Sequence, residues 1–214
     1  MKNMDKYLSP TFFIDSSHPA IVAYARQHTA GATTDVQKTI LLFEAVRDGF
    51  YYDPYRIDLK REAFIASNIL KRERAYCIEK AIVLAAVLRA AGLPARLYFG
   101  NVKNHIATQK FREYLQTDVM VFHGSSEVFL HGEWIKLTPA FNKTLCEKLN
   151  VDPLVFNGTS DAIFQQFDRA HHQFMEYLED YGSFADLPYA LLISEFKRFY
   201  GHIPYIKNWK EEIG

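Results

Sequence analysis

The chain has 214 residues, of which 49% are hydrophobic, and these values fit a single domain with a sizeable core. Lys+Arg and Asp+Glu are equal at 25 each, so the net charge of zero argues against binding to nucleic acid or a membrane surface. The only cysteines are Cys77 and Cys146, and the first residues lack the apolar stretch of a secretory signal. We therefore expect reduced thiols and a cytoplasmic location.

Hydrophobic periodicity and turn residues predict the elements in chain order. They indicate a short strand over 11–15, helices over 20–28, 34–48, 63–71 and 77–91, and strands over 95–99, 118–122, 127–130 and 133–137. His131-Gly132 joins the last two strands as a two-residue hairpin, and further helices are expected over 161–180 and 186–200. This order predicts an α+β fold, with a core of about 34–142 and a helical C-terminal extension of about 150–214, in one domain of residues 1–214.

The helix that begins at Cys77 carries the strongest signal for chemistry. Its apolar residues recur at helical spacing, Gly92 suits a left-handed C-cap, and Pro94 ends the helix. Cys77 lies in the first turn, where free backbone N–H groups and the helix dipole favour a thiolate and lower the thiol pKa. The sequence thus predicts that Cys77 is a nucleophile, whereas Cys146 is expected to be a packing residue. Glu79 and Lys80 are expected to face solvent.

A cysteine nucleophile requires a base, and eight histidines are available. His123 is the preferred candidate because it is expected at the end of an apolar strand, ahead of the hairpin. His105, in a loop after a strand, is the weaker alternative. The group that orients the base is expected from the end of the next strand, where Thr138 and Asn142 are the polar choices.

These blocks resemble the transglutaminase-like superfamily of papain-fold cysteine enzymes, which includes predicted cysteine proteases. The resemblance covers about residues 34–142 and rests on two blocks: a cysteine that opens an Ala/Leu-rich helix ending in Arg89-Ala90-Ala91-Gly92-Leu93-Pro94-Ala95-Arg96, and a histidine followed by Glu127-Val128-Phe129-Leu130-His131-Gly132-Glu133-Trp134 and Thr138-Pro139. The resemblance implies a papain-like fold, with N-terminal helices on an antiparallel sheet. It also implies a Cys77–His123 pair that forms an acyl-enzyme.

Two positions depart from the family pattern. Thr138 stands where Asp is usual, so it can accept a hydrogen bond from imidazole but adds no charge; Asn142 could take that role instead. Tyr76 precedes the cysteine where Gly or Trp is common, and its phenol is expected to line the substrate cleft or donate to the oxyanion, for which the Cys77 N–H is the safer donor. Asn104 is a second candidate for substrate contact.

The leading hypothesis is a cysteine peptidase or amidase that acts on a peptide, a protein or a small amide. Transglutaminase-type transfer to an amine shares the same acyl-enzyme and remains an alternative. So does a non-catalytic module that binds a peptide or protein, which the missing Asp motivates. A structural protein that assembles through its C-terminal helices is a third possibility. No metal-ligand spacing or phosphate-binding loop occurs, so no cofactor, metal, nucleic acid or membrane partner is expected, and the oligomeric state is left open.

Overall fold

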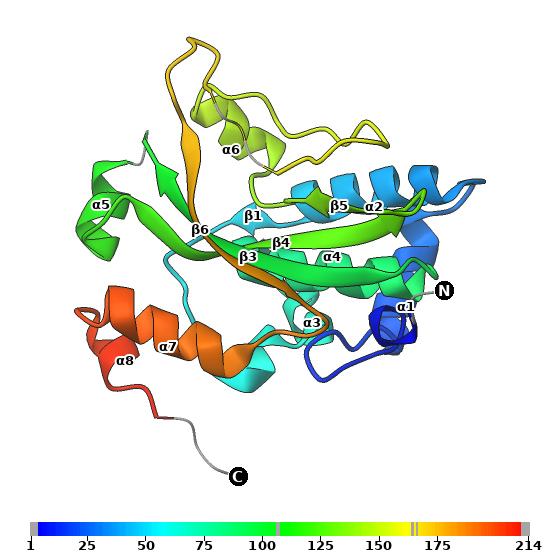
Figure 1. Cartoon of the computed structure of the whole chain (residues 1–214), viewed down its shortest axis with the longest axis horizontal. Helices are drawn as coiled ribbons and strands as arrows, with labels where there is room; N and C mark the ends of the chain where they lie inside the picture. Colours follow the sequence, from blue (N-terminus) through cyan, green and yellow to red (C-terminus); the bar gives the residue numbers. More distant parts are fainter. Residues whose placement is uncertain (1–3, 106–107, 164, 166, 211–214) are drawn as a thin grey trace.

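The computed structural model describes residues 4–105, 108–163, 165 and 167–210. A four-stranded antiparallel sheet in the order β5-β4-β3-β6 packs on the long helix α4, and further helices cover the other side of α4 (Figure 1). The sheet strands are β3 (Ala95–Asn104), β4 (Val119–Leu130), β5 (Glu133–Leu137) and β6 (Met175–Phe184). This architecture confirms the predicted α+β fold with helices on an antiparallel sheet.

The helices that precede the sheet form where their caps predict. They are η1 (Asp5–Tyr7), α1 (Pro19–His28), α2 (Asp35–Gly49), η2 (Arg61–Phe64), α3 (Ala66–Ile69) and α4 (Cys77–Ala90). Proline opens α1, and the Thr34 hydroxyl accepts the Gln37 N–H at 3.2 Å at the start of α2. Residues 11–15, predicted as a strand, form a loop instead, because Phe13 and Ile14 both turn into the core.

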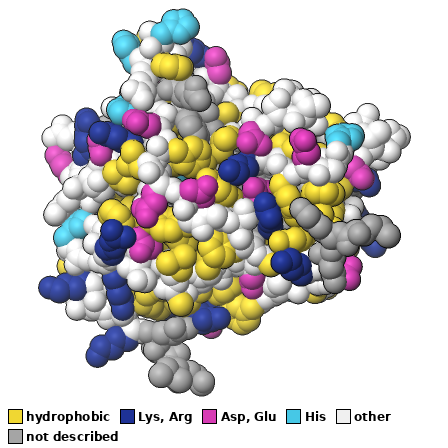
Figure 2. Space-filling model, viewed as in Figure 1, with side chains coloured by type: hydrophobic (Ala, Val, Ile, Leu, Met, Phe, Trp, Pro, Cys, Tyr) yellow, Lys and Arg dark blue, Asp and Glu magenta, His cyan; other side chains and the backbone are white. Residues whose placement is uncertain are grey.

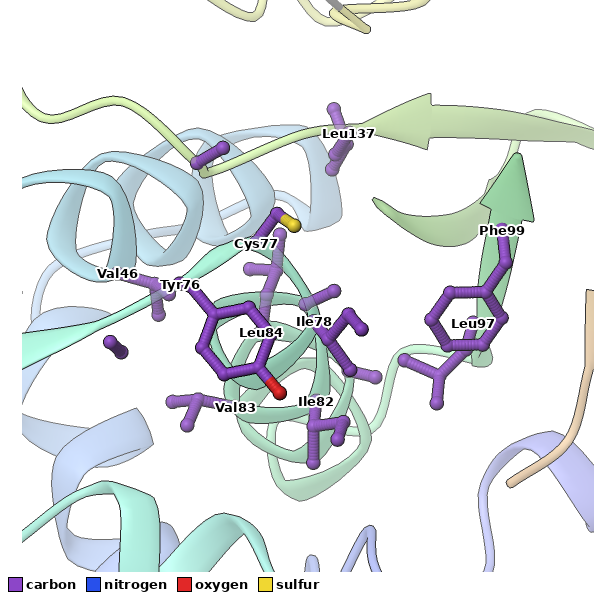
Figure 3. Close-up of a cluster of buried hydrophobic side chains, with 14 of the residues drawn as sticks. Val46, Tyr76, Cys77, Ile78, Ile82, Val83, Leu84, Leu97, Phe99 and Leu137 are labelled. Carbon is purple, nitrogen blue, oxygen red and sulfur yellow. The ribbon is translucent and has the colours of Figure 1, made fainter. Parts of the chain in front are cut away.

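Helix α4 is buried on all sides, with every residue from Cys77 to Arg89 inside. Its end follows the prediction, since Gly92 adopts a φ of +83° that suits glycine. Figure 3 shows Cys77 in the first turn, with Ile82, Val83 and Leu84 further along the helix and Leu97 and Phe99 of β3 beside it. The nucleophile candidate therefore stands at the start of a helix that is buried along almost its whole length.

Strand β4 is longer than predicted. Two separate strands were expected, with His123 at the end of the first, but β4 continues without a loop through Gly124, Ser125 and Ser126. The serines are fully buried: Ser126 Oγ donates to the Ala81 carbonyl at 2.7 Å, and Ser125 Oγ lies 2.6 Å from Thr138 Oγ1. These bonds satisfy their hydroxyls inside the sheet, so the prediction that His123 ends a strand is wrong.

The segment after β5 differs from its prediction in one element. Helix α7 (Tyr189–Tyr200) and the short α8 (Pro204–Lys207) agree with a helical C-terminal part. The helix predicted over 161–180 is wrong, because residues 175–184 form β6 and pair with β3, from Leu97↔Phe184 to Asn104↔Met175. Its burial alternates only weakly, as in a strand at a sheet edge. The short helices α5 (Gln109–Leu115) and α6 (Lys143–Lys148) complete the set.

Residues far apart in sequence hold the N-terminal end of α4. A two-residue parallel pair, β1 (Tyr51–Tyr52) with β2 (Arg74–Ala75), brings the segment after α2 alongside the residues before Cys77. Acidic and basic side chains are interspersed over most of the face in Figure 2, in keeping with the zero net charge. Among the described helices, none combines the length and the apolar character that a bilayer crossing requires.

Candidate active site

The sulfur of Cys77 lies where β4 passes the start of α4. The backbone N–H groups of Ile78 and Gly124 lie near enough to it to lower the pKa of the thiol. Gly124 is the point of closest approach: a Cβ there would lie 2.8 Å from the Ile78 Cα and 3.2 Å from the Cys77 carbonyl oxygen. Strand β5 is paired with β4 only up to Ser126↔Leu137. The part of β4 next to the Cys77 sulfur therefore lies beyond the last residue of β4 that is paired with β5. His123 is therefore the chain neighbour of a residue that approaches Cys77 closely.

Tyr52 is a third polar neighbour of the sulfur. Its phenol lies near enough to lower the pKa of the Cys77 thiol, and its backbone N–H donates to Asn142 Oδ1 at 3.0 Å. From the sequence, Tyr52 belongs to an aromatic segment that fits the rim of a substrate cleft and core packing almost equally well. No local signal could reveal the contact, since Tyr52 reaches Cys77 through the pairing of β1 with β2.

Burial dominates the acid–base state of Cys77. Desolvation raises the pKa of the thiol to about 11, although the donors Gly124, Ile78 and Tyr52 each lower it. The buried carboxylate of Glu79 also raises it. The expectation that the helix N-terminus produces a low thiol pKa is therefore wrong for this state of the protein.

His123 is buried, with 2% of its surface exposed, and neither ring nitrogen has a hydrogen-bond partner among the described residues. Desolvation lowers its pKa to about 4. The imidazole is thus neutral near pH 7 and keeps a free lone pair, as a proton acceptor requires. Among the described residues, no hydrogen bond joins the His123 imidazole to Cys77 in this structure.

This burial leads to a prediction about stability. The pKa of His123 is about 4 in the folded chain against an ordinary value of 6.5, so the folded state binds the proton less well than the unfolded chain does. The contribution of the neutral His123 side chain to the free energy of unfolding is fully present above about pH 6.5 and is lost as the pH falls through about 4. From pH 7 to pH 4, wild type should lose about 3 kcal/mol of unfolding free energy that His123→Leu does not lose, measured by urea denaturation. Parallel pH curves for wild type and His123→Leu would refute it, and His105→Leu is the control.

The two candidates for orienting the imidazole are bonded to other groups. Thr138 Oγ1 pairs with Ser125 Oγ, which lies two residues after His123 and so shares its face of β4. Asn142 uses its oxygen for the Tyr52 N–H and its amide nitrogen for Thr144 Oγ1 at 2.6 Å. Thr138 therefore lies next to the face of β4 that carries the His123 side chain, whereas Asn142 is hydrogen-bonded to Tyr52.

The remaining candidates divide between the cavity walls and the surface. Tyr76 lines the same cavity as Cys77, and its hydroxyl has no partner among the described residues. Asn104 lines an adjoining cavity with Tyr52. The alternative base His105 instead lies 3.0 Å from Glu176 Oε2. Cys146 is fully buried, in agreement with its expected packing role.

Glu79 and Lys80 are not on a solvated face, so that expectation is wrong. Glu79 accepts the Tyr76 N–H at 3.1 Å and pairs with Arg72 at 2.5 Å. The Lys80 ammonium donates to three backbone carbonyls, those of Arg47 at 2.7 Å, Phe50 at 3.3 Å and Ala140 at 2.8 Å. The two charged side chains connect the start of α4 to its neighbours and thereby fix the position of Cys77.

Two solved structures are similar to the chain. One, a "putative cysteine protease" from Cytophaga hutchinsonii, has a TM-score of 0.52 at 15% identity over 83% of this chain and 52% of that one. The other, a "putative protease" from Parabacteroides distasonis, has a TM-score of 0.41 at 16% identity over 63% of this chain and 25% of that one. The chain thus spans about half the length of the first structure and a quarter of the second.

No curated protein sequence matches the chain. The likeness to the Cytophaga structure supports the fold alone at this identity. The family model described as the transglutaminase-like superfamily matches residues 22–139, which is more than half of the chain and includes Cys77, His123 and Thr138. The chain therefore belongs to the transglutaminase-like superfamily.

Proposed function

We propose that this protein is a thiol-dependent acyl-transfer enzyme that hydrolyses amide or peptide bonds, with Cys77 as nucleophile and His123 as base. The observation that carries the proposal is a buried sulfur at the start of a helix where β4 approaches closely at Gly124, with the Gly124 and Ile78 N–H groups and the Tyr52 phenol near enough to lower the pKa of the thiol. Donors placed around a sulfur can also stabilise the charges that develop when it attacks a carbonyl.

The chemistry starts from a neutral pair, because the pKa values of about 11 for Cys77 and about 4 for His123 leave both groups uncharged near pH 7. The sulfur attacks the carbonyl carbon as its proton passes to the imidazole. The Cys77 N–H and the Tyr52 phenol are the donors proposed for the resulting oxyanion. The amine leaves with the proton from His123, and water then attacks the thioester and releases the acid.

The orienting role goes to Thr138, which lies beside Ser125 on the face of His123. Its hydroxyl is bonded to Ser125 and not to the imidazole in this structure, so it must exchange partners to hold one tautomer, and it stabilises the imidazolium less than an aspartate would. A non-catalytic binding module is the competing function, and the raised pKa of the Cys77 thiol favours it.

Acyl-enzyme formation separates these two functions. With p-nitrophenyl acetate, we expect release of p-nitrophenol, an acetyl group on Cys77 detected by peptide mass spectrometry, and its later loss to water. Cys77→Ala should abolish the adduct, whereas Cys146→Ala, which removes the other buried cysteine, should not. A Cys77 that acquires acetyl no faster than Cys146 would establish the binding module instead, whereas selective acetylation that is released to an added amine and not to water would establish amine transfer.

A further inference from the structure

Strand β4 is irregular immediately before His123. The register of β4 with β3 shifts between the pairs Gly100↔His123 and Val102↔Met120. Two residues of β4 therefore lie opposite a single residue of β3, Asn101. Such a β-bulge bends the strand that carries the extra residue and changes the direction in which a nearby side chain points. The β-bulge thus lies next to the proposed base.

Phe122, the second residue of the bulge, has a left-handed backbone. Its φ is +59°, although its side chain is fully buried. The other described non-glycine residues with a positive φ are all exposed, namely Gln116, His131, Asn150 and His171. A left-handed conformation is unfavourable for a bulky residue and persists only where the surrounding structure holds it. Some neighbouring group must therefore hold Phe122 in this conformation.

The Asn101 side chain provides this restraint. It is 2% exposed, and its Oδ1 accepts the Phe122 N–H at 2.9 Å. Its amide nitrogen donates to Glu179 Oε2 at 2.8 Å and to the Tyr181 hydroxyl at 2.9 Å, both on β6, the strand on the other side of β3 (Figure 1). The Tyr181 hydroxyl donates in turn to Glu195 Oε2 at 2.7 Å, so it accepts from Asn101. These acceptors turn the amide nitrogen toward β6 and the amide oxygen toward Phe122.

Strand β4 is held in place on both sides of the bulge. Before the bulge, the Tyr200 hydroxyl is bonded to backbone groups of the first and third residues of β4. After the bulge, Gly124 lies against the first turn of α4, and Ser126 Oγ donates to a carbonyl of the same helix. His123 is the one residue between Phe122 and Gly124. A change in the backbone at Phe122 would therefore displace His123 before any other residue of the site.

We propose that Asn101 is a positioning residue for the base: its Oδ1 holds Phe122 in the left-handed conformation and thereby fixes the direction of the His123 side chain relative to Cys77. Asparagine suits this position because it offers an acceptor to the N–H and donors to the two acceptors on β6. Leucine offers neither, and aspartate offers the acceptor alone. This inference rests on the proposed function, because it assumes that His123 takes the proton from Cys77.

The test is the single-turnover rate at which the full chain releases p-nitrophenol from p-nitrophenyl acetate, with folding of each variant checked by urea denaturation. Asn101→Leu removes the acceptor with little change in volume and should lower this rate by about 10- to 100-fold, as a misplaced catalytic group does. Asn101→Asp keeps the acceptor and should retain most of the rate. Tyr181→Phe is the matched control, because it removes a partner of Asn101 on β6 but leaves the bond to Phe122. It should keep the wild-type rate.

A double variant separates positioning from a general loss of structure. In the His123→Gln background, Asn101→Leu should cause no further loss of rate, because the group that it positions is already absent. If Asn101→Leu does not fold, Asn101→Gln, which moves the amide oxygen by one methylene, replaces it with the same expectation.

Four results would overturn the positioning role but not the base. They are a wild-type rate in Asn101→Leu, an equal loss in Asn101→Asp, an equal loss in Tyr181→Phe, and an undiminished further loss in the His123→Gln background. A wild-type rate in His123→Gln itself would instead overturn the proposed base, and the positioning role with it.

Discussion

Replacing His123 by Gln should lower the rate of acyl transfer from p-nitrophenyl acetate to Cys77 by about 10²- to 10⁴-fold, the usual contribution of a general base. Glutamine keeps a polar side chain of similar size but cannot accept the thiol proton at neutral pH. Because the Cys77 thiol is protonated near pH 7, the attack depends on proton removal as the S–C bond forms. Single-turnover release of p-nitrophenol measures this rate directly.

The matched control for His123→Gln is His105→Gln, since His105 is the other histidine candidate and lies beside Glu176 instead of Cys77. His105→Gln should retain the wild-type rate. Raising the pH should partly restore His123→Gln, because hydroxide can then generate the thiolate without a base. A fall in His105→Gln with a normal rate in His123→Gln would transfer the role of base to His105.

Replacing Lys80 by Met should lower the free energy of unfolding by about 3–5 kcal/mol. Methionine fills a similar volume but leaves the carbonyls of Arg47, Phe50 and Ala140 without their donor in a site where Lys80 is 0% exposed. These carbonyls belong to the end of α2 and to the loops that flank Cys77. Urea denaturation at pH 7 provides the measurement.

Lys143→Met is the control for this change, because Lys143 is 58% exposed and its pair with Asp48 lies at the surface. Its removal should change the unfolding free energy by less than about 1 kcal/mol. If Lys80→Met were as stable as Lys143→Met, the three carbonyl bonds would not contribute to the stability of the site.

The sequence predicts the nucleophile helix well because its signals are local. The position of Cys77, the apolar periodicity and Gly92 lie within one segment, and each acts on backbone geometry directly. The strand character of β4 at Ser125 and Ser126 could not be read in the same way. Serines indicate a loop unless their hydroxyls find buried partners, and those partners, Thr138 and Ala81, come from other elements.

Long-range contacts also explain the other errors. The carbonyls that bind Lys80 lie 30, 33 and 60 residues away in the chain, so the side chain resembles an exposed lysine until the fold is known. Strand β6 is largely exposed and lacks a clear apolar alternation, so its pairing with β3 decides its conformation. Burial likewise sets the pKa of Cys77, which the helix N-terminus alone would lower.

The position of β6 bears on where this protein can be divided. The family match ends at residue 139, but β3 is an inner strand only because β6 covers it. The Tyr200 hydroxyl on α7 also accepts the Val121 N–H at 2.7 Å and donates to the Val119 carbonyl at 3.0 Å. A fragment that ends at residue 139 would lack β6 and would leave eight paired positions of β3 as an exposed strand edge that favours aggregation. It would also lack Tyr200 and would lose the hydrogen bonds to the first residues of β4, the strand that carries His123. The minimal recombinant unit that preserves the contacts of the strand that carries His123 therefore extends through Tyr200.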